Sequence, residues 1–352
     1  MRPLARPFGY TYNQSMEPVR PVTAHDVAHR AGVSQATVSL VLSHHPRARV
    51  SQATRDRVIR VAEELGYRPN VVAQSLVARR SFALGLIVPD LANPFFAGVV
   101  SGAERVAAEE GYAVLLCEAK ELPVERHLEA LRSRQIDGVI LDALGARALD
   151  EASLGGLNVV LIDEPSARFP GIASDALGAG RLAAGHLLEL GHRRVAYLGP
   201  ATDVHAVRMR ERGAMQTLAA AGVSVASEWL RRVAPTAAGG QEGMRTLLTR
   251  GPRPTAVICV NDLVAIGAMK AASRLGVRVP DDCSIVGCDD LELARLVTPE
   301  LTTVAVPARE LGARAARLLV RRLAGKELPG ATRPLPVRLV VRGTTAIPPV
   351  TT

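Results

Sequence analysis

The chain has 352 residues, a formal net charge of +9 and 48% hydrophobic residues. This length exceeds that of one small domain and suits two or three, each with its own core. Residues 1–80 hold twelve arginines, no lysine and five acidic residues, so this segment carries +7 of the +9. A basic N-terminal segment before a nearly neutral remainder is typical of a phosphate-binding module attached to a separate ligand-sensing domain. Ordinary solubility charge in an arginine-rich chain is the alternative.

The N-terminal segment 1–21 lacks the apolar stretch of a signal peptide and reads as a basic, disordered extension. No apolar run approaches the ~18 residues of a membrane helix. The four cysteines, Cys117, Cys259, Cys283 and Cys288, lack metal-ligand spacing and are expected to be reduced, mostly buried thiols. We therefore expect a cytoplasmic protein that has no contact with the membrane, no metal and no cofactor.

Residues 22–69 predict a helix-turn-helix module. Thr23 is placed to cap a first helix, with Asp26 three residues later, and Gly32 can end that helix in a left-handed conformation. Ser34 can then cap the second helix. Two helices joined around a glycine form a helix-turn-helix, whose second helix can enter the major groove of DNA. The predicted core contains Val27, Val33, Val38, Val41, Leu42, Val58, Val61 and Leu65.

The next segment, 70–81, predicts a short helix followed by a linker. A helix over residues 70–78 is shorter than the ~12–15 residues that are stable alone in water. It is therefore marginal on its own. A generic linker helix is the plain alternative for this stretch.

The segments DVAHRAGVSQATVSLVL and GYRPNVVAQSL resemble the DNA-binding headpiece and hinge of the LacI/GalR repressors. In that family the hinge helix forms on operator DNA, packs against its dimer mate, and inserts a leucine into the minor groove. The resemblance therefore implies DNA contacts from the hinge residues Asn70, Ala73, Gln74 and Leu76.

The second helix presents one face for reading DNA. Gln35 can bond adenine, and Ala36 can contact a thymine methyl group. Leu40 departs from the basic residue common in the family and offers only apolar contact. Ser34, Thr37, Ser39 and the nearby arginines are better suited to phosphates, and Thr23 is a further candidate for DNA contact. An ordinary exposed helix surface is the alternative for Gln35.

From residue 82 the chain alternates apolar strand-like runs with amphipathic helical stretches. The strand-like runs are 83–90, 112–119, 138–144, 158–164, 194–200, 255–261 and 283–290. Continuous apolar strands separated by helices predict parallel sheets covered on both faces, and their number suggests two Rossmann-like halves. The resemblance implies the α/β periplasmic-binding-protein type 1 fold over 82–352. Its three crossings are expected near Glu164, Leu291 and Lys326, giving subdomain N (82–163, 292–325) and subdomain C (164–291, 326–352).

Polar and aromatic residues follow several of these strands, where open α/β sheets bind ligands. The resemblance places the effector cleft here, and the candidates are Asp90, Asn93, Phe95, Phe96, Asp163, Arg210, Asn261 and Asp289. Such groups suit a hydroxyl-rich or anionic molecule, for example a sugar or another polar metabolite. Asn261 and Asp289 could instead cap helices, and Phe95 and Phe96 could be core. Pro235 stands where many family members place an aromatic that stacks on the ligand.

The sequence contains none of the common catalytic or nucleotide-binding motifs. It has no GxGxxG after a strand, no GxxxxGK[ST], no HExxH and no GxSxG, and the histidines are scattered. An enzyme such as a sugar kinase or dehydrogenase is therefore disfavoured. A cytoplasmic small-molecule-binding protein without a DNA role is the main alternative.

Together these patterns predict a sequence-specific transcriptional regulator, most simply a dimeric repressor on a palindromic operator, controlled by a small-molecule effector. The C-terminal IPPVTT lacks the leucine heptads that would make a tetramer.

Overall fold

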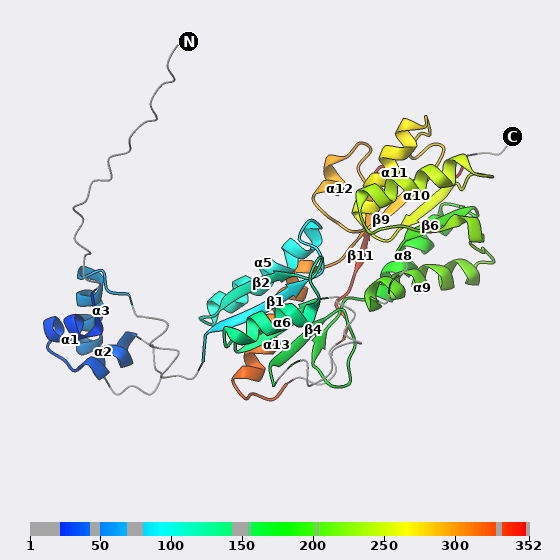
Figure 1. The fold of residues 1–352 in the computed structure, drawn as a ribbon. Helices are drawn as coiled ribbons and strands as arrows, with labels where there is room; N and C mark the ends of the chain where they lie inside the picture. Colours follow the sequence, from blue (N-terminus) through cyan, green and yellow to red (C-terminus); the bar gives the residue numbers. More distant parts are fainter. Residues whose placement is uncertain are drawn as a thin grey trace, which may run out of the picture. The chain divides into compact units, whose positions relative to one another are not determined.

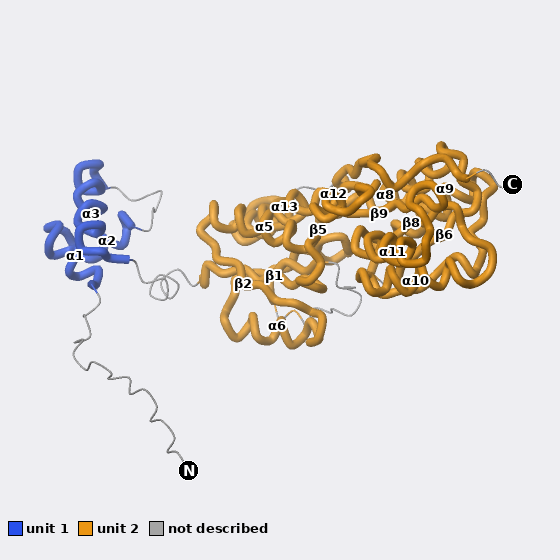
Figure 2. The backbone as a smooth tube through the Cα atoms, turned by 90° about the horizontal axis from the view of Figure 1, so that it is seen from above, with its two compact units in different colours: residues 1–79 blue, residues 80–352 orange. Residues whose placement is uncertain are grey.

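The computed structural model describes residues 22–42, 50–68, 80–142, 154, 156–200, 202, 204–328 and 333–349. The chain divides into two compact units, residues 1–79 and residues 80–352 (Figure 2). The predicted N-terminal extension and the predicted hinge helix over 70–78 lie outside the described residues. Within the described part of the chain, each helix is too short or too polar to cross a bilayer.

In the described residues of the first unit, three helices pack together: α1 (Ala24–Ala31), α2 (Gln35–Leu42) and α3 (Gln52–Glu64) (Figure 1). Thr23 and Asp26 form a complete capping box, because Asp26 Oδ2 accepts from Thr23 N at 2.8 Å while Thr23 Oγ1 accepts from Asp26 N. Gly32 takes φ 63°, which lets the chain turn sharply into α2. The core consists of Val27, Ala28, Ala31, Val38, Val41, Val58, Val61 and Ala62. The predicted helix-turn-helix is confirmed.

The second unit begins with a parallel five-stranded sheet of order β2-β1-β3-β4-β5. Its strands are β1 (Ala83–Val88), β2 (Ala113–Glu118), β3 (Gly138–Asp142), β4 (Asn158–Ile162) and β5 (Gly171–Ile172). Helices α5 (Pro94–Glu109) and α13 (Ala308–Leu323) pack on the face that carries Leu84, Leu86 and Val88. Helix α6 (Val124–Ser133) covers the opposite face through Leu128 and Leu131. We call this sheet and its helices the first lobe.

The second lobe contains a six-stranded sheet of order β11-β10-β9-β8-β6-β7, in which only β11 is antiparallel. Its strands are β6 (Val195–Gly199), β7 (Leu230–Arg232), β8 (Ala256–Cys259), β9 (Ser284–Asp289), β10 (Thr302–Ala305) and β11 (Arg338–Val340). Helices α8 (Ala176–Glu189) and α9 (His205–Ala220) lie on one face, and α10 (Ala237–Thr249) and α11 (Asp262–Arg274) on the other (Figure 1). The short helices η2 (Ser227–Trp229) and α12 (Leu293–Leu296) lie in connections. The two predicted Rossmann-like halves are confirmed.

Two of the three crossings between the lobes lie away from the expected positions near Glu164 and Leu291. The first lies at residues 173–175, after β5, and the second lies between β10 and α13, at residues 306–307. Expecting the second crossing near Leu291 was wrong, because β10 pairs in parallel with β9 and so keeps residues 292–305 in the second lobe. With four residues, β10 is too short for an alternation of apolar and polar residues to be recognised in the sequence. The third crossing falls between Leu323 and Arg338, a range that includes Lys326.

Candidate functional site

The exposed face of α2 carries the side chains expected to read bases. Gln35, Ala36, Ser39 and Leu40 are exposed, and Leu40 retains 39% of its accessible surface. Val38 and Val41 on the same helix are fully buried against α1 and α3. The helix therefore presents a small, mostly uncharged face to solvent, although the contacts of these residues with DNA remain a prediction.

Three of the hydroxyl residues expected to contact DNA, Thr23, Ser34 and Thr37, already have local hydrogen-bond partners. Ser34 Oγ accepts from Thr37 N at 3.1 Å and lies 2.9 Å from Thr37 Oγ1, so both residues secure the start of α2. Thr23 does the same for α1 through its capping box. Each hydroxyl can still make a further hydrogen bond. The remaining candidates, Asn70, Ala73, Gln74 and Leu76, lie outside the described residues.

In the first lobe, the candidates that follow β1 mainly build the start of α5. Asp90 forms an ion pair with Lys120 at 3.0 Å and accepts from Ala92 N, and Asn93 caps α5 by accepting from Phe95 N at 3.1 Å. Phe95 and Phe96 are buried in the core with their rings edge to face. Both phenylalanines are therefore core residues, and Phe95 also borders a cavity of about 800 Å³; contact of either with an effector stays a prediction.

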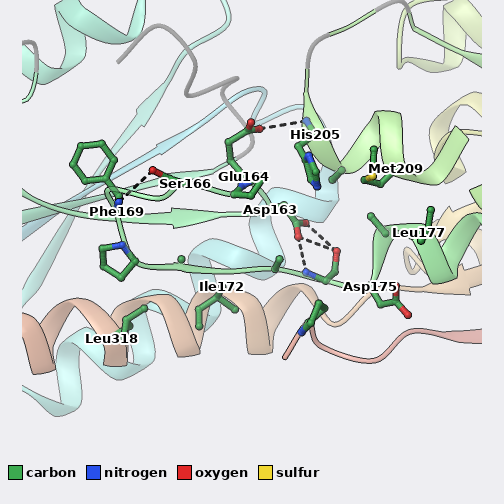
Figure 3. Close-up of a pocket in the computed structure, with 18 residues that line it drawn as sticks. Asp163, Glu164, Ser166, Phe169, Ile172, Asp175, Leu177, His205, Met209 and Leu318 are labelled. Atoms are coloured by element: carbon green, nitrogen blue, oxygen red, sulfur yellow. Dashed lines mark hydrogen bonds between the residues drawn. The ribbon is translucent and has the colours of Figure 1, made fainter. Parts of the chain in front are cut away.

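A cavity of about 600 Å³ opens where the first lobe meets the start of α9 (Figure 3). Asp163 lines it with φ 54°, and its carboxylate accepts from Ser174 N at 2.6 Å and Ser174 Oγ at 2.9 Å. The next residue, Glu164, accepts from His205 N, the first residue of α9, at 3.3 Å. Two adjacent carboxylates after β4 thus bond different segments. Asp163 bonds the first crossing, and Glu164 bonds the first turn of α9 in the second lobe.

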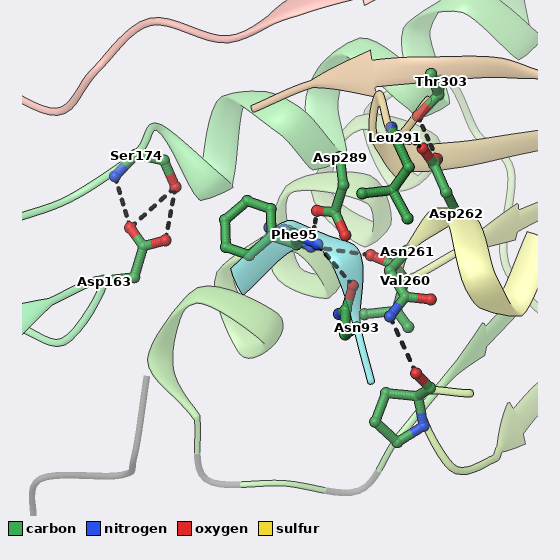
Figure 4. A network of polar contacts seen from close by, with 12 residues as sticks. Asn93, Phe95, Asp163, Ser174, Val260, Asn261, Asp262, Asp289, Leu291 and Thr303 are labelled. Carbon is green, nitrogen blue, oxygen red and sulfur yellow. Dashed lines mark hydrogen bonds and ion pairs between the residues drawn. The ribbon is translucent and has the colours of Figure 1, made fainter. Parts of the chain in front are cut away.

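In the second lobe, Arg210 and Asp289 form a buried ion pair. Arg210 Nη1 lies 3.2 Å from Asp289 Oδ1 and donates to Val260 O at 3.1 Å. Burial raises the pKa of the Asp289 carboxyl to about 7, although Arg210 lowers it. Asn261, on the neighbouring strand end, caps α11 by accepting from Val264 N at 2.9 Å and donates to Pro235 O (Figure 4). The capping alternative is therefore correct for Asn261 but not for Asp289.

The candidates do not converge on one cavity. Asp163 lines the 600 Å³ cavity, Phe95 and Asp289 line the 800 Å³ cavity, and Arg210 lines a much smaller cavity beside Cys259 and Cys288. Asp90, Asn93, Phe96 and Asn261 are not among the described residues that line these three cavities. The two large cavities contain residues of both lobes, so a ligand there could contact both lobes at once.

Two buried carboxylates, Asp142 and Asp262, are not among the site residues chosen from the sequence. Asp142 ends β3, and neither of its oxygens has a hydrogen-bond partner among the described residues. Burial, with a smaller effect from Asp163, raises its pKa well above the usual range. Asp262 accepts from Leu291 N at 2.8 Å and from Thr303 Oγ1, while burial raises its pKa to about 6. Both follow apolar strand runs, the same signal that singled out Asp163.

A helix-turn-helix unit followed by a two-lobed α/β unit with cavities between its lobes defines a ligand-responsive DNA-binding regulator. The comparisons with known proteins agree with this class. Residues 23–70 match the model of bacterial regulatory proteins of the lacI family, and residues 184–345 match a periplasmic binding protein-like domain.

One curated relative and two solved structures illustrate the similarity. The transcriptional repressor CytR of Escherichia coli K12 is 34% identical over 92% of this chain and 96% of its own. The crystal structure of the Lac repressor dimer bound to operator and an anti-inducer has a TM-score of 0.81 at 31% identity, covering 93% of this chain and 100% of that one. A LacI family regulator from Enterococcus faecium with bound ribose has a TM-score of 0.68 at 28% identity, covering 75% and 99%.

The chain belongs to the LacI family. It is a DNA-binding, effector-regulated transcriptional repressor. Because its relatives are repressors, the expectation of a regulator instead of an enzyme is confirmed.

Proposed function

We propose that the chain acts as a cytoplasmic homodimer that represses transcription from a palindromic operator, each subunit reading one half-site through Gln35, Ala36 and Leu40. The observation that supports this assignment is the exposure of these three side chains on α2, opposite the helix face that carries the buried Val38 and Val41. Two-fold symmetry of the protein would then match two-fold symmetry of the DNA. We take 22–69 as the headpiece, 70–81 as hinge and linker, and 82–352 as the effector domain.

The Gln35→Ala variant tests base reading. It should lose about 1–3 kcal/mol of affinity for the preferred operator and relax the base preference at one position in each half-site. Binding titrations of the full chain against operators carrying each base at that position give both quantities. Gln52→Ala is a matched control, because Gln52 is an exposed glutamine of the same unit whose side chain bonds Asp56. Equal affinity and base preference in wild type and Gln35→Ala would refute the assignment.

The Leu76→Ala variant tests the proposed minor-groove wedge. An apolar side chain inserted between base pairs kinks the duplex and adds contacts only on the specific site. The variant should therefore lose much more affinity for the operator than for random DNA, and the operator should bend less in a gel-mobility or energy-transfer assay. An equal loss on both DNAs would show that Leu76 does not act as a wedge.

The effector, we propose, is a polar small molecule held between the lobes, with Asp163 among the groups that bind it. Support comes from the cavities shared by the two lobes and from Asp163, whose carboxylate bonds Ser174 at the first crossing. A ligand hydroxyl that bonds Asp163 would compete with Ser174, and this would change the relative energy of two lobe arrangements. A coupling of ~1–3 kcal/mol would change operator affinity by roughly 5–150-fold.

Thermal unfolding with ribose, other sugars, nucleosides and organic acids tests this proposal, since a ligand of the folded state raises the unfolding temperature. A compound that stabilises the wild type and changes its operator affinity is expected. Asp163→Asn should weaken that effect. If every such compound acts equally on wild type and Asp163→Asn, the site assignment fails while repression by the DNA-binding unit still stands.

A further inference from the structure

The chain enters the second unit through a tightly bonded group of side chains. Asp137, in the turn between α6 and β3, accepts from Ser81 N at 2.9 Å through Oδ1 and from Phe82 N at 3.0 Å through Oδ2. Ser81 Oγ adds a third bond to Asp137 Oδ1. The Asp137 side chain is 9% exposed. One nearly buried carboxylate therefore fixes two consecutive backbone amides at the start of the unit.

Arg80, the first residue of the second unit, is partly exposed and contacts the same group of side chains. Its guanidinium donates to the Tyr112 hydroxyl and lies 3.8 Å from Asp137 Oδ2. It also lies over the rings of Phe82 and Tyr112, with centroid distances of 5.8 Å and 5.6 Å. Both distances are within the ~6 Å at which an aromatic ring attracts a cation, so the two rings help to hold the guanidinium beside them. We call Arg80, Ser81, Phe82, Tyr112 and Asp137 the entry joint.

The backbone of the entry joint adopts an unusual conformation. Phe82 has φ 54°, a left-handed value that a bulky residue rarely adopts. The bond from Phe82 N to Asp137 and the bond from Ala113 N to Phe82 O, 2.9 Å long, hold this residue on both sides. The direction in which the chain enters the lobe is therefore fixed by side chains of three separate segments.

The entry joint lies at the end of the first lobe away from the cavities. Phe82 precedes β1, Tyr112 precedes β2 and Asp137 precedes β3, whereas Asp163 follows β4 and Phe95 lies beyond the carboxyl end of β1. A six-residue strand spans about 20 Å. A ligand in the cavities therefore cannot touch the joint, and any effect on the preceding segment must pass through motion of the whole lobe.

We propose that Asp137 and Arg80 are positioning residues. They would make the chain before residue 80, which leads to the DNA-binding unit, rotate together with the first lobe. A rigid joint transmits a rotation of the lobe to the chain that precedes it. A loose joint would absorb the rotation in the backbone around Ser81 and Phe82. The joint would then set how precisely the headpieces of a dimer are held on an operator, without itself touching DNA or effector.

The test compares Asp137→Ala, Arg80→Ala and Asp282→Ala in the full-length protein. The DNA probe is a duplex carrying the site that the wild type enriches from random DNA, with a scrambled duplex as non-specific competitor. Asp282 is the matched control, because it also bonds a backbone amide and an arginine, Arg278 N and the Arg278 guanidinium, but in a second-lobe loop. Thermal unfolding of each variant reports whether the second unit stays folded.

Asp137→Ala should lower specific affinity by about tenfold and leave non-specific affinity within about twofold, whereas Asp282→Ala leaves both unchanged. A merely structural role would lower both affinities together, in proportion to the unfolded fraction. If Asp137→Ala does not fold, the Arg80→Ala variant tests the proposal instead. The Arg80 side chain is 38% exposed, so its removal should destabilise the unit less. Arg80→Ala should then lose specific affinity about threefold or more. Wild-type specific affinity in the folded variants, or a parallel loss on both DNAs, overturns the proposal.

Discussion

Replacing Arg210 with methionine should destabilise the second unit by about 3–5 kcal/mol at pH 8, because the change leaves the Asp289 carboxylate buried without its partner. The Asp289 side chain is only 3% exposed, and Arg210 Nη1 is 3.2 Å from it. Urea unfolding followed by circular dichroism measures the loss. Arg212→Met is the matched control, since Arg212 is exposed on the same helix, and it should change stability by less than about 0.5 kcal/mol.

The same variant should show a specific pH dependence. Burial raises the pKa of Asp289 to about 7 in the folded protein, against an ordinary value of 3.8, and losing Arg210 removes a group that lowers it. A raised carboxyl pKa means that the folded state binds the proton more tightly than the unfolded state does. The destabilisation of Arg210→Met should therefore shrink as the pH falls from 8 to 5. The double variant Arg210→Met, Asp289→Asn should recover part of the loss at pH 8. A loss below about 1 kcal/mol, unchanged by pH, would contradict the buried-pair account.

Replacing Gly180 with alanine should be nearly as damaging. Helices α8 and α9 pack so closely that a Cβ on Gly180 would lie 1.9 Å from Arg210 O, a backbone atom that cannot rotate away. The two helices must separate, and overpacking of this kind costs about 1–3 kcal/mol or occasionally more. Because Arg210 O belongs to the residue that pairs with Asp289, the shift should also disturb that ion pair.

Gly185→Ala, on the same helix, is the control for Gly180→Ala. A Cβ on Gly185 would meet nothing within 4 Å. Alanine is a better helix former than glycine, so this variant should gain about 0.4–1 kcal/mol. Opposite signs for the two substitutions in urea unfolding would support the close packing of α8 on α9. Equal stability of the two variants would contradict this close packing.

Local signals in the sequence predicted the helix-turn-helix well. Thr23, Asp26, Gly32 and Ser34 act within a few residues of one another, so their caps and turn can be read without knowing the tertiary fold. The apolar spacing in α2 likewise predicted that Val38 and Val41 are buried while Gln35 is exposed. Short-range physics determines these features.

Long-range pairing was much harder to predict. The role of β10 depends on its register with β9, which no local pattern encodes, so the second crossing was placed too early. Phe95 follows β1 in the chain, as the sequence predicted, but its burial depends on neighbours from other segments. The Arg210–Asp289 pair joins residues far apart in the chain, and the sequence indicated only that both lie near strand or loop ends. The sequence also did not predict that Ser174 bonds Asp163. The two residues meet only because the chain folds back after β4 and passes Asp163 at the first crossing.

The central claim is that this repressor binds a specific operator as a two-fold symmetric dimer. Selection of bound sites from random duplex DNA tests it most directly, carried out near physiological salt because non-specific affinity depends strongly on salt. A parallel selection in the presence of a metabolite mixture covers the case in which a corepressor is required. An enriched inverted repeat in either selection is the predicted result. Enrichment of no sequence in both, or of a single half-site without symmetry, would contradict the account.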